Sequence, residues 1–208
     1  MKTLLVKYTP RMERSNTKKL LDAFKSEIKN SEVEEIDLSV DVPDMFLNGS
    51  LHAYIERNYL GKDLVQEKKN LMSKMDRMTV QLKSADIVVM GFPMFNFSMP
   101  AAVKAWFDSV MQKGQTWNNR DGNYVGMMNG KKALVLVSSG GYYKGSMVSW
   151  EHALSLAKLE FQFMGYSDVR GILAEGMNSG EESKSFSLRN SIVEVQKIAH
   201  EWYGKESN

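Results

Sequence analysis

The sequence predicts an α/β fold built on a doubly wound, five-stranded parallel sheet with helices on both faces. Short apolar segments alternate along the chain with segments whose apolar residues recur at helical spacing. Parallel strands need a covering helix between them, so this alternation favours parallel pairing. The segments DIVVM (86–90) and ALVLV (133–137) are apolar almost throughout. Such runs are typical of central strands that are covered on both faces.

The first half of the chain supplies three of the predicted strands. The elements expected there are a strand at 3–8, a helix around 20–28, a half-polar edge strand at 33–38, a charged helix at 62–83, a strand at 86–90 and a helix at 101–112. Residues 41–61 lack a clear period, and we expect them to be irregular.

The second half supplies the other two strands. Glycines at 114, 122, 126 and 130 predict a loop. After it we expect a strand at 133–137, a helix at 153–164, a strand at 168–176 and a helix at 188–202. Five strands and five helices of this kind favour the flavodoxin-type order 2-1-3-4-5. Because there is no internal repeat or low-complexity linker, residues 1–208 are expected to form a single domain.

The composition narrows the classes of function. A formal net charge of only +2 gives no reason to expect binding to nucleic acid or to an anionic membrane. The absence of cysteine excludes disulfides, thiolate metal sites and thiol nucleophiles. The three histidines are scattered, so we expect no metal site. No apolar run suits a signal peptide or a membrane span, and a cytoplasmic location is therefore expected.

Three unusual loops follow the first, third and fourth predicted strands. Because the carboxyl ends of parallel strands share one edge, and ligands bind there at the switch point, we expect these loops to converge. The first loop carries Thr9, Ser15, Asn16 and Thr17, and it ends where a helix begins. Hydroxyls, free amides and the helix dipole would suit a phosphate, and Arg11 or Arg14 could add charge. Alternatively, Ser15 or Asn16 only caps the helix.

The second loop contains Pro93, Met94, Phe95, Asn96 and Phe97. Backbone groups of a loop stiffened by proline can hydrogen-bond the edge of a flat heterocycle, while Met or aromatic side chains flank its face. Asn96 could tie the loop together. The alternative is that Phe95 and Phe97 simply pack beneath the loop.

The third loop contains Ser138, Ser139, Gly140 and Gly141. Its glycines allow close backbone approach and positive φ, and its donors could face the electron-rich edge of a ring. A plain turn would explain two glycines equally well. Taken together, a phosphate site, a flat-ring site and a set of backbone donors at one edge predict a pocket for flavin mononucleotide (FMN).

The same motifs resemble a known family. PMFNFSMPAAVKAWFD (93–108), GQTW (114–117), GKKALVLVSSGGYY (130–143) and MGYSDVRGILAEGM (164–177) resemble the FMN-dependent NADH-azoreductases, a branch of the flavodoxin-like NAD(P)H:quinone oxidoreductases. The resemblance covers nearly the whole chain. This chain differs from the family at two places. Tyr8-Thr9 stands where the family often has two serines, and Ser139 stands where the family often has arginine.

The resemblance implies an activity and an assembly. It places the FMN phosphate at Ser15–Thr17 with Thr9 nearby, the ring against Met94–Phe97, and the far edge of the ring at Ser138–Gly141. It implies a ping-pong reaction in which NADH or NADPH passes hydride to the flavin, and a quinone or azo compound then takes it. No side chain of this chain is implied as a catalytic group. Two other functions stay open, namely a flavodoxin-like electron carrier and a non-enzymatic FMN-binding regulatory module.

The resemblance also implies a homodimer with the active site at the interface. Residues 41–61, with Phe46, Tyr54 and Tyr59, would then cover the substrate side of the partner's pocket. The alternative is an ordinary loop that protects the edge strand.

Overall fold

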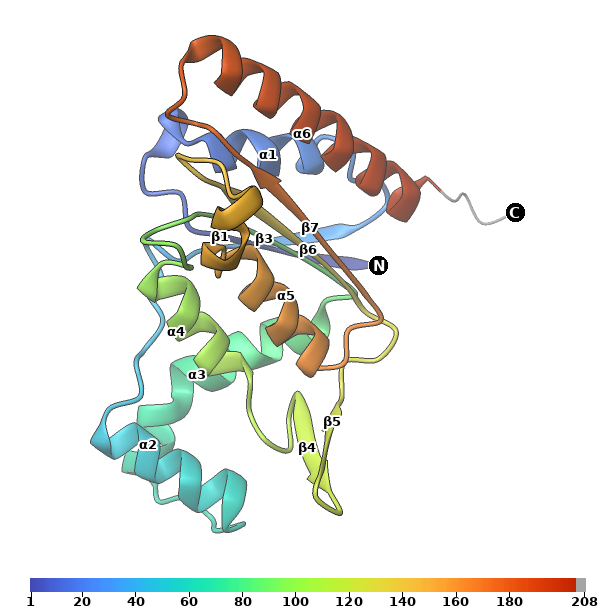
Figure 1. Cartoon of the computed structure of the whole chain (residues 1–208). Helices are drawn as coiled ribbons and strands as arrows, with labels where there is room; N and C mark the ends of the chain where they lie inside the picture. Colours follow the sequence, from blue (N-terminus) through green and yellow to red (C-terminus); the bar gives the residue numbers. More distant parts are fainter. Residues whose placement is uncertain (205–208) are drawn as a thin grey trace.

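The computed structural model describes residues 1–204. Its main sheet has five parallel strands in the order β2-β1-β3-β6-β7 (Figure 1). Its strands are β1 (Lys2–Lys7), β2 (Glu32–Asp37), β3 (Ile87–Pro93), β6 (Lys132–Ser138) and β7 (Asp168–Ala174). Numbered among themselves, these strands have the order 2-1-3-4-5, so the predicted topology is confirmed. The half-polar strand predicted at 33–38 is an edge strand, as expected.

Helices cover both faces of this sheet. On one face lie α1 (Asn16–Lys25) and α6 (Glu181–Tyr203), and on the other lie α3 (Gln66–Ser84), α4 (Ala101–Val110) and α5 (Leu154–Phe163) (Figure 1). Alternate side chains of β3 enter opposite layers: Val88 and Met90 pack on the α3–α5 side, and Ile87 and Val89 pack on the α1–α6 side. This two-sided burial explains why the central strands are apolar throughout. No helix within residues 1–204 combines the length and the apolarity that crossing a bilayer would require.

The expectation that residues 41–61 are irregular is wrong for 48–59. The structure has an α-helix there, α2 (Asn48–Tyr54), which continues into a π-helical turn, η2 (Ile55–Tyr59). The Ser50 hydroxyl stabilises the first turn by accepting a hydrogen bond from the Leu47 amide at 2.9 Å. Tyr54 is buried with Met72 and Met75 of α3. Tertiary packing therefore stabilises a helix whose own sequence begins with the turn formers Asn48 and Gly49.

Arg57 of this π-helical turn fixes the segment to the rest of the molecule. Its guanidinium donates to both carboxylate oxygens of Asp76 on α3, at 2.6 and 2.8 Å. It also donates at 2.7 Å to Oε1 of Gln112, a buried residue just after α4. A bidentate arginine bond of this kind defines orientation as well as distance. Residues 48–59 are thus held in a defined position against α3 and α4.

The predicted loop at 114–130 contains a β-hairpin that the sequence reading missed. Its strands are β4 (Trp117–Arg120) and β5 (Asn123–Gly126), and Figure 1 shows the hairpin projecting from the edge of the molecule. The turn residues Asp121 and Gly122 have φ values of 52° and 82°, as a type I′ turn requires. Two short 3₁₀ segments complete the structure, η1 (Met12–Arg14) and η3 (Gly145–Trp150).

Candidate functional site

Four loops meet around a pocket of about 220 Å³ at the carboxyl edge of the sheet. The strand register aligns this edge, since Pro93 of β3 pairs with Ser138 of β6, which pairs with Ala174 of β7. The pocket is lined by Pro10, Arg11, Ser15, Asn16, Pro93, Met94, Phe95, Ser138, Ser139, Gly140, Met177 and Asn178. The three loops singled out in the sequence therefore converge, and the loop after β7 joins them.

The loop after β1 places one positive charge at this pocket. The carbonyl of Thr9 accepts from the Met12 amide at 2.8 Å, which closes a type I turn with Pro10 and Arg11 at its centre. Among the described residues that line the pocket, Arg11 is the only charged one. Glu13, the acid nearest to it in the sequence, pairs with Lys18 instead, at 3.4 Å. The guanidinium is therefore available to an anionic ligand.

The start of α1 combines capping with free backbone donors. Ser15 is the N-cap, and its hydroxyl oxygen accepts from the Lys18 amide at 3.2 Å. The capping alternative is therefore correct for Ser15, although a capping hydroxyl still has its own proton to donate. The amides of Asn16 and Thr17 lie in the first turn, where a helix offers no partner. These donors and the helix dipole favour a negatively charged group.

Thr9 and Thr17 lie behind the wall of the pocket rather than in it. Both are buried. The hydroxyl of Thr17 shares a 2.7 Å hydrogen bond with the hydroxyl of Ser138. This bond links the start of α1 to the end of β6, so it holds two of the four loops together.

Residues 95–98 form a tight hairpin turn with a strained backbone. Phe95 and Ser98 exchange two backbone hydrogen bonds, of 2.9 and 3.0 Å. Between them Asn96 and Phe97 have φ values of 48° and 71°, the two positive values of a type I′ turn. A bulky residue such as phenylalanine rarely adopts positive φ, and such strain is concentrated at functional sites. The side chain of Asn96 forms no hydrogen bond within residues 1–204, so its contribution lies in the turn conformation and not in the expected tie.

The aromatic side chains of this turn face outward. Phe95 is 45% exposed and Phe97 is 42% exposed. The alternative that both rings pack beneath the loop is therefore wrong. Met94, in contrast, packs partly against the core, and its amide donates at 2.8 Å to the carbonyl of Ser138. The turn thus presents two apolar rings beside a pocket of polar donors.

The loop after β6 is close-packed against the loop after β7. A Cβ atom at Gly140 would lie 2.5 Å from Nδ2 of Asn178, so a larger residue here would require the Asn178 side chain to shift. The amides of Met177 and Asn178 donate to the carbonyls of Ser139 and Gly140, each at 3.0 Å. The expectation of positive φ at Gly140 and Gly141 is wrong, because neither adopts it. Close approach is the reason for glycine at 140, and Gly141 borders open space.

Ser139, the position at which the resemblance led us to expect arginine, has a structural contact in this loop. It is buried, and its hydroxyl donates at 2.9 Å to the carbonyl of Gly141. The positive charge that borders the pocket comes instead from Arg11, on the opposite loop.

Met177 and Asn178 are pocket residues that the sequence reading did not select. They follow the last strand, whose carboxyl end lies on the same edge as the others. This topology was a usable signal, because every loop after a strand of a parallel sheet reaches that edge.

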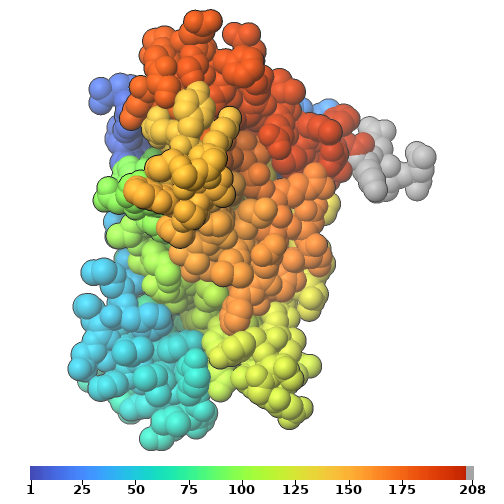
Figure 2. Space-filling model, in the orientation of Figure 1, coloured from blue at the N-terminus to red at the C-terminus, as the bar shows by residue number. Residues whose placement is uncertain are grey.

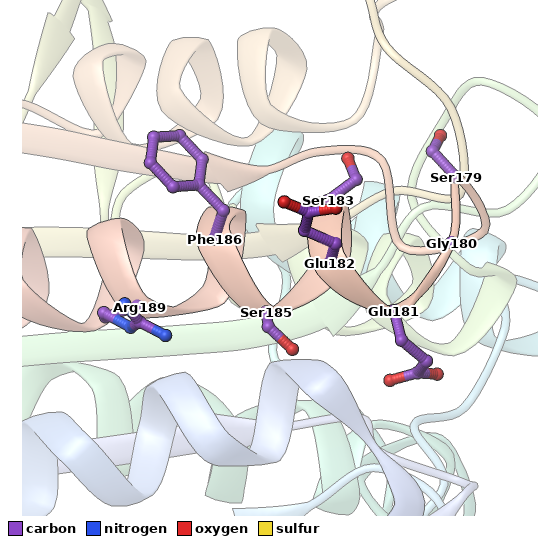
Figure 3. A pocket seen from close by; sticks show the side chains of 8 residues that line it. All are labelled: Ser179, Gly180, Glu181, Glu182, Ser183, Ser185, Phe186 and Arg189. Carbon is purple, nitrogen blue, oxygen red and sulfur yellow. The ribbon is translucent and has the colours of Figure 1, made fainter.

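A larger hollow, of about 770 Å³, lies against the first turns of α6 (Figure 3). Its labelled side chains spread around the helix instead of converging, with Phe186 and Arg189 pointing to different sides. Glu181 and Glu182 place negative charge at the helix N-terminus, where it opposes the binding of an anion. This hollow therefore lacks the convergent polar groups of a ligand site.

Comparisons with known proteins identify the family. Residues 1–198 match the family described as "Flavodoxin-like fold". An FMN-dependent NADH:quinone oxidoreductase of Polaromonas naphthalenivorans (strain CJ2) is 32% identical over 191 residues, covering 91% of this chain and 87% of that protein. An FMN-dependent NADH:quinone oxidoreductase 1 of Idiomarina loihiensis is 33% identical over 172 residues, covering 82% and 88%.

Solved structures agree with these sequence matches. An azoreductase from Bacillus anthracis str. Sterne superposes with a TM-score of 0.88 at 25% identity, covering 97% of this chain and 99% of that one. An FMN-dependent NADH-azoreductase from Bacillus anthracis str. Ames Ancestor, solved in complex with FMN, gives a TM-score of 0.85 at 27% identity with the same coverage. The chain therefore belongs to the flavodoxin-like family that includes the FMN-dependent NADH:quinone oxidoreductases and azoreductases.

Proposed function

We propose that this protein is an FMN-dependent NAD(P)H oxidoreductase that reduces quinones and azo compounds. The observation that carries the proposal is the strained turn at 95–98, which presents two exposed rings beside a pocket of polar groups. A flat, apolar ring joined to a phosphate matches that combination. The relatives named as FMN-dependent NADH:quinone oxidoreductases support the same activity.

The residues of the pocket fit the parts of FMN. Arg11, Ser15 and the amides of Asn16 and Thr17 would hold the phosphate, with the buried Thr9 and Thr17 side chains supporting this loop. The isoalloxazine ring would lie against Pro93–Phe97, and Ser138–Gly141 would face its polar edge. At about 220 Å³ the pocket is smaller than the roughly 300–1,000 Å³ of typical ligand sites. It would therefore enclose part of the cofactor and leave the ring on the open side of the turn.

When bound, FMN supplies the two-electron chemistry, taking hydride from NADH or NADPH and giving it to the acceptor. The chain's own residues bind and orient it. The apolar rings of Phe95 and Phe97 would exclude water from one side. The loop after β6 would be held in place by the hydrogen bonds that its carbonyls accept from the loop after β7. We assign no catalytic acid, base or nucleophile to this chain.

Rapid mixing tests the activity. Anaerobic addition of NADH or NADPH to FMN-loaded protein should abolish the visible absorbance within the time of a turnover, and a quinone should restore it. Double-reciprocal plots at several fixed acceptor concentrations should be parallel, because nucleotide and acceptor would use the same face in turn. A flavodoxin-like carrier would need a separate reductase, and a regulatory module would be reduced slowly or not at all. Intersecting lines would show a ternary complex and contradict a shared site.

We further propose a homodimer in which the partner completes the open side of this site. A groove of about 900 Å³ runs between residues 42–50, α3 and the start of α4. Exposed apolar side chains line it: Val42, Met45, Leu47 and Leu71. Ala101 and Ala102 in its wall come directly after the 95–98 turn and Pro100, so a second copy seated here would border the ring site. Aromatic residues of the 41–61 segment were expected to cover the partner's pocket. One of them, Tyr54, is instead buried and packs with Phe46 inside this subunit.

The dimer prediction has a matched control. Leu47→Asp should convert the protein to a monomer in sedimentation or light-scattering measurements and lower its turnover, because the groove would lose its apolar complementarity. Val193→Asp changes a similarly exposed apolar residue on α6, away from the groove, and should leave the dimer intact. A wild-type protein that is monomeric at micromolar concentration would contradict the proposal.

A further inference from the structure

Three aromatic side chains form a corner beside the candidate flavin site. The ring of Phe97 meets the indole of Trp150 at a centroid distance of 5.3 Å and an interplanar angle of 86°. It meets the ring of Tyr143 at 6.4 Å and 79°. Both are edge-to-face contacts, which leave ring faces uncovered. Trp150 is 49% exposed, whereas Trp106 in the core is fully buried.

The backbone holds Trp150 firmly although its side chain is open. The amide of His152 donates at 2.8 Å to the carbonyl of Phe97, which joins the segment after η3 to the strained turn. Glu151, the next residue after Trp150, accepts from the amides of Ala153 and Leu154 at 2.7 and 2.6 Å, and so anchors the start of α5. The segment that follows Trp150 is therefore fixed between the 95–98 turn and the start of α5.

No residue of η3 belongs to the buried core. None of its residues, from Gly145 to Trp150, is buried. In Figure 2 the corresponding yellow-orange segment stands out on the surface, next to the green segment that contains the 95–98 turn. A large apolar residue that is rigidly held and left half exposed beside a ligand site is better explained by contact with a ligand than by packing.

We propose that Trp150 is a specificity-determining residue, which together with Phe97 forms a wall for flat acceptors of two or more fused rings. This inference rests on the proposed reductase function and names the acceptor class that the site prefers. A single-ring acceptor placed over the flavin would reach Phe97 alone. A fused-ring acceptor would extend to the indole and gain a second aromatic contact.

Trp150 lies outside the cofactor pocket and beside Phe97, on the side that we assign to the acceptor, so its main effect should be on acceptor binding. Loss of one aromatic contact lowers affinity by about two- to tenfold. Because the contact would be the same in the bound acceptor and in the transition state, the loss should appear in KM and not in kcat.

The test compares two quinones on the FMN-loaded protein. For Trp150→Leu, kcat/KM with a methylated naphthoquinone should fall about two- to tenfold through KM, and kcat/KM with p-benzoquinone should change less than about twofold. Trp150→Phe should recover much of the loss. Phe186→Ala, at an exposed aromatic residue on α6, is the matched control and should change neither acceptor.

Two further readouts separate this inference from the proposed function. FMN affinity and the rate at which NADH reduces the flavin should be unchanged in Trp150→Leu. Equal effects on both quinones, or none, would overturn the role of Trp150 while the reductase function stood. A wild-type protein that NADH does not reduce would instead refute the proposed function itself.

Discussion

Replacing Arg11 with glutamine should weaken FMN binding roughly ten- to a hundredfold, the loss expected for a hydrogen bond to a charged group. Arg11 is the only charged side chain among the described residues that line the pocket, and the type I turn through Pro10 fixes its backbone. Titration of apoprotein with FMN and with riboflavin measures the effect. Riboflavin lacks the phosphate, so its affinity should be the same for wild type and variant.

Arg14 provides the control for this experiment. It belongs to the same loop and is also exposed, but it does not line the pocket. Arg14→Gln should therefore leave the ratio of FMN to riboflavin affinity close to that of wild type. Raising the salt concentration should weaken FMN binding to wild type more than to Arg11→Gln, because salt screens exposed charges. If Arg11→Gln binds FMN as tightly as wild type, the helix terminus and Ser15 suffice for the phosphate.

The topology could be predicted because its signals are local. DIVVM and ALVLV show in their composition that both faces of their strands are covered, and the periodic helices between them imply parallel crossovers. The helix at 48–54 could not be predicted in this way. It is short and starts with Asn-Gly, and its stability comes from Tyr54 packing on α3 and from Arg57 bonding to Asp76. The hairpin at 117–126 did carry a local signal, the Asp121-Gly122 pair.

The site was predictable at the level of loops but not of contacts. Parallel topology alone brings the segments after β1, β3 and β6 to one edge, and the structure places them there. Which hydroxyls point into the pocket depends on tertiary partners. Thr17 is turned toward Ser138, and Gly140 lies close against the side chain of Asn178. These contacts join residues more than 35 positions apart in the sequence, so no local pattern could reveal them.

Glu160 on α5 makes stability depend on pH. Its side chain is buried, and within the described residues its Oε2 atom has no hydrogen-bond partner. The Lys104 ammonium on α4 lies 3.7 Å from the other oxygen, Oε1, but Lys104 also pairs with Asp108. Burial is the largest influence and raises the pKa of Glu160 to about 7, against the partial opposition of Lys104.

The direction of the pH effect follows from this pKa. Between the unfolded pKa of 4.5 and the folded pKa of about 7, the folded protein holds a proton that the unfolded chain releases. The free energy of unfolding therefore falls as pH rises through this window, by on the order of 3 kcal/mol in total. Glu160→Gln keeps the shape and cannot ionise. It should match wild type near pH 4.5 and exceed its stability at pH 8.

Urea unfolding of wild type and Glu160→Gln at several pH values from 4.5 to 8 measures this difference, with FMN absent from both so that ligand binding does not contribute. Glu182→Gln, at an exposed carboxylate of α6, should show no comparable gain. A Glu160→Gln protein that is less stable than wild type at pH 8 would show that the ion pair with Lys104 outweighs the cost of burial. In that case the α4–α5 contact would be held by charge, and its stability would rise with pH instead of falling.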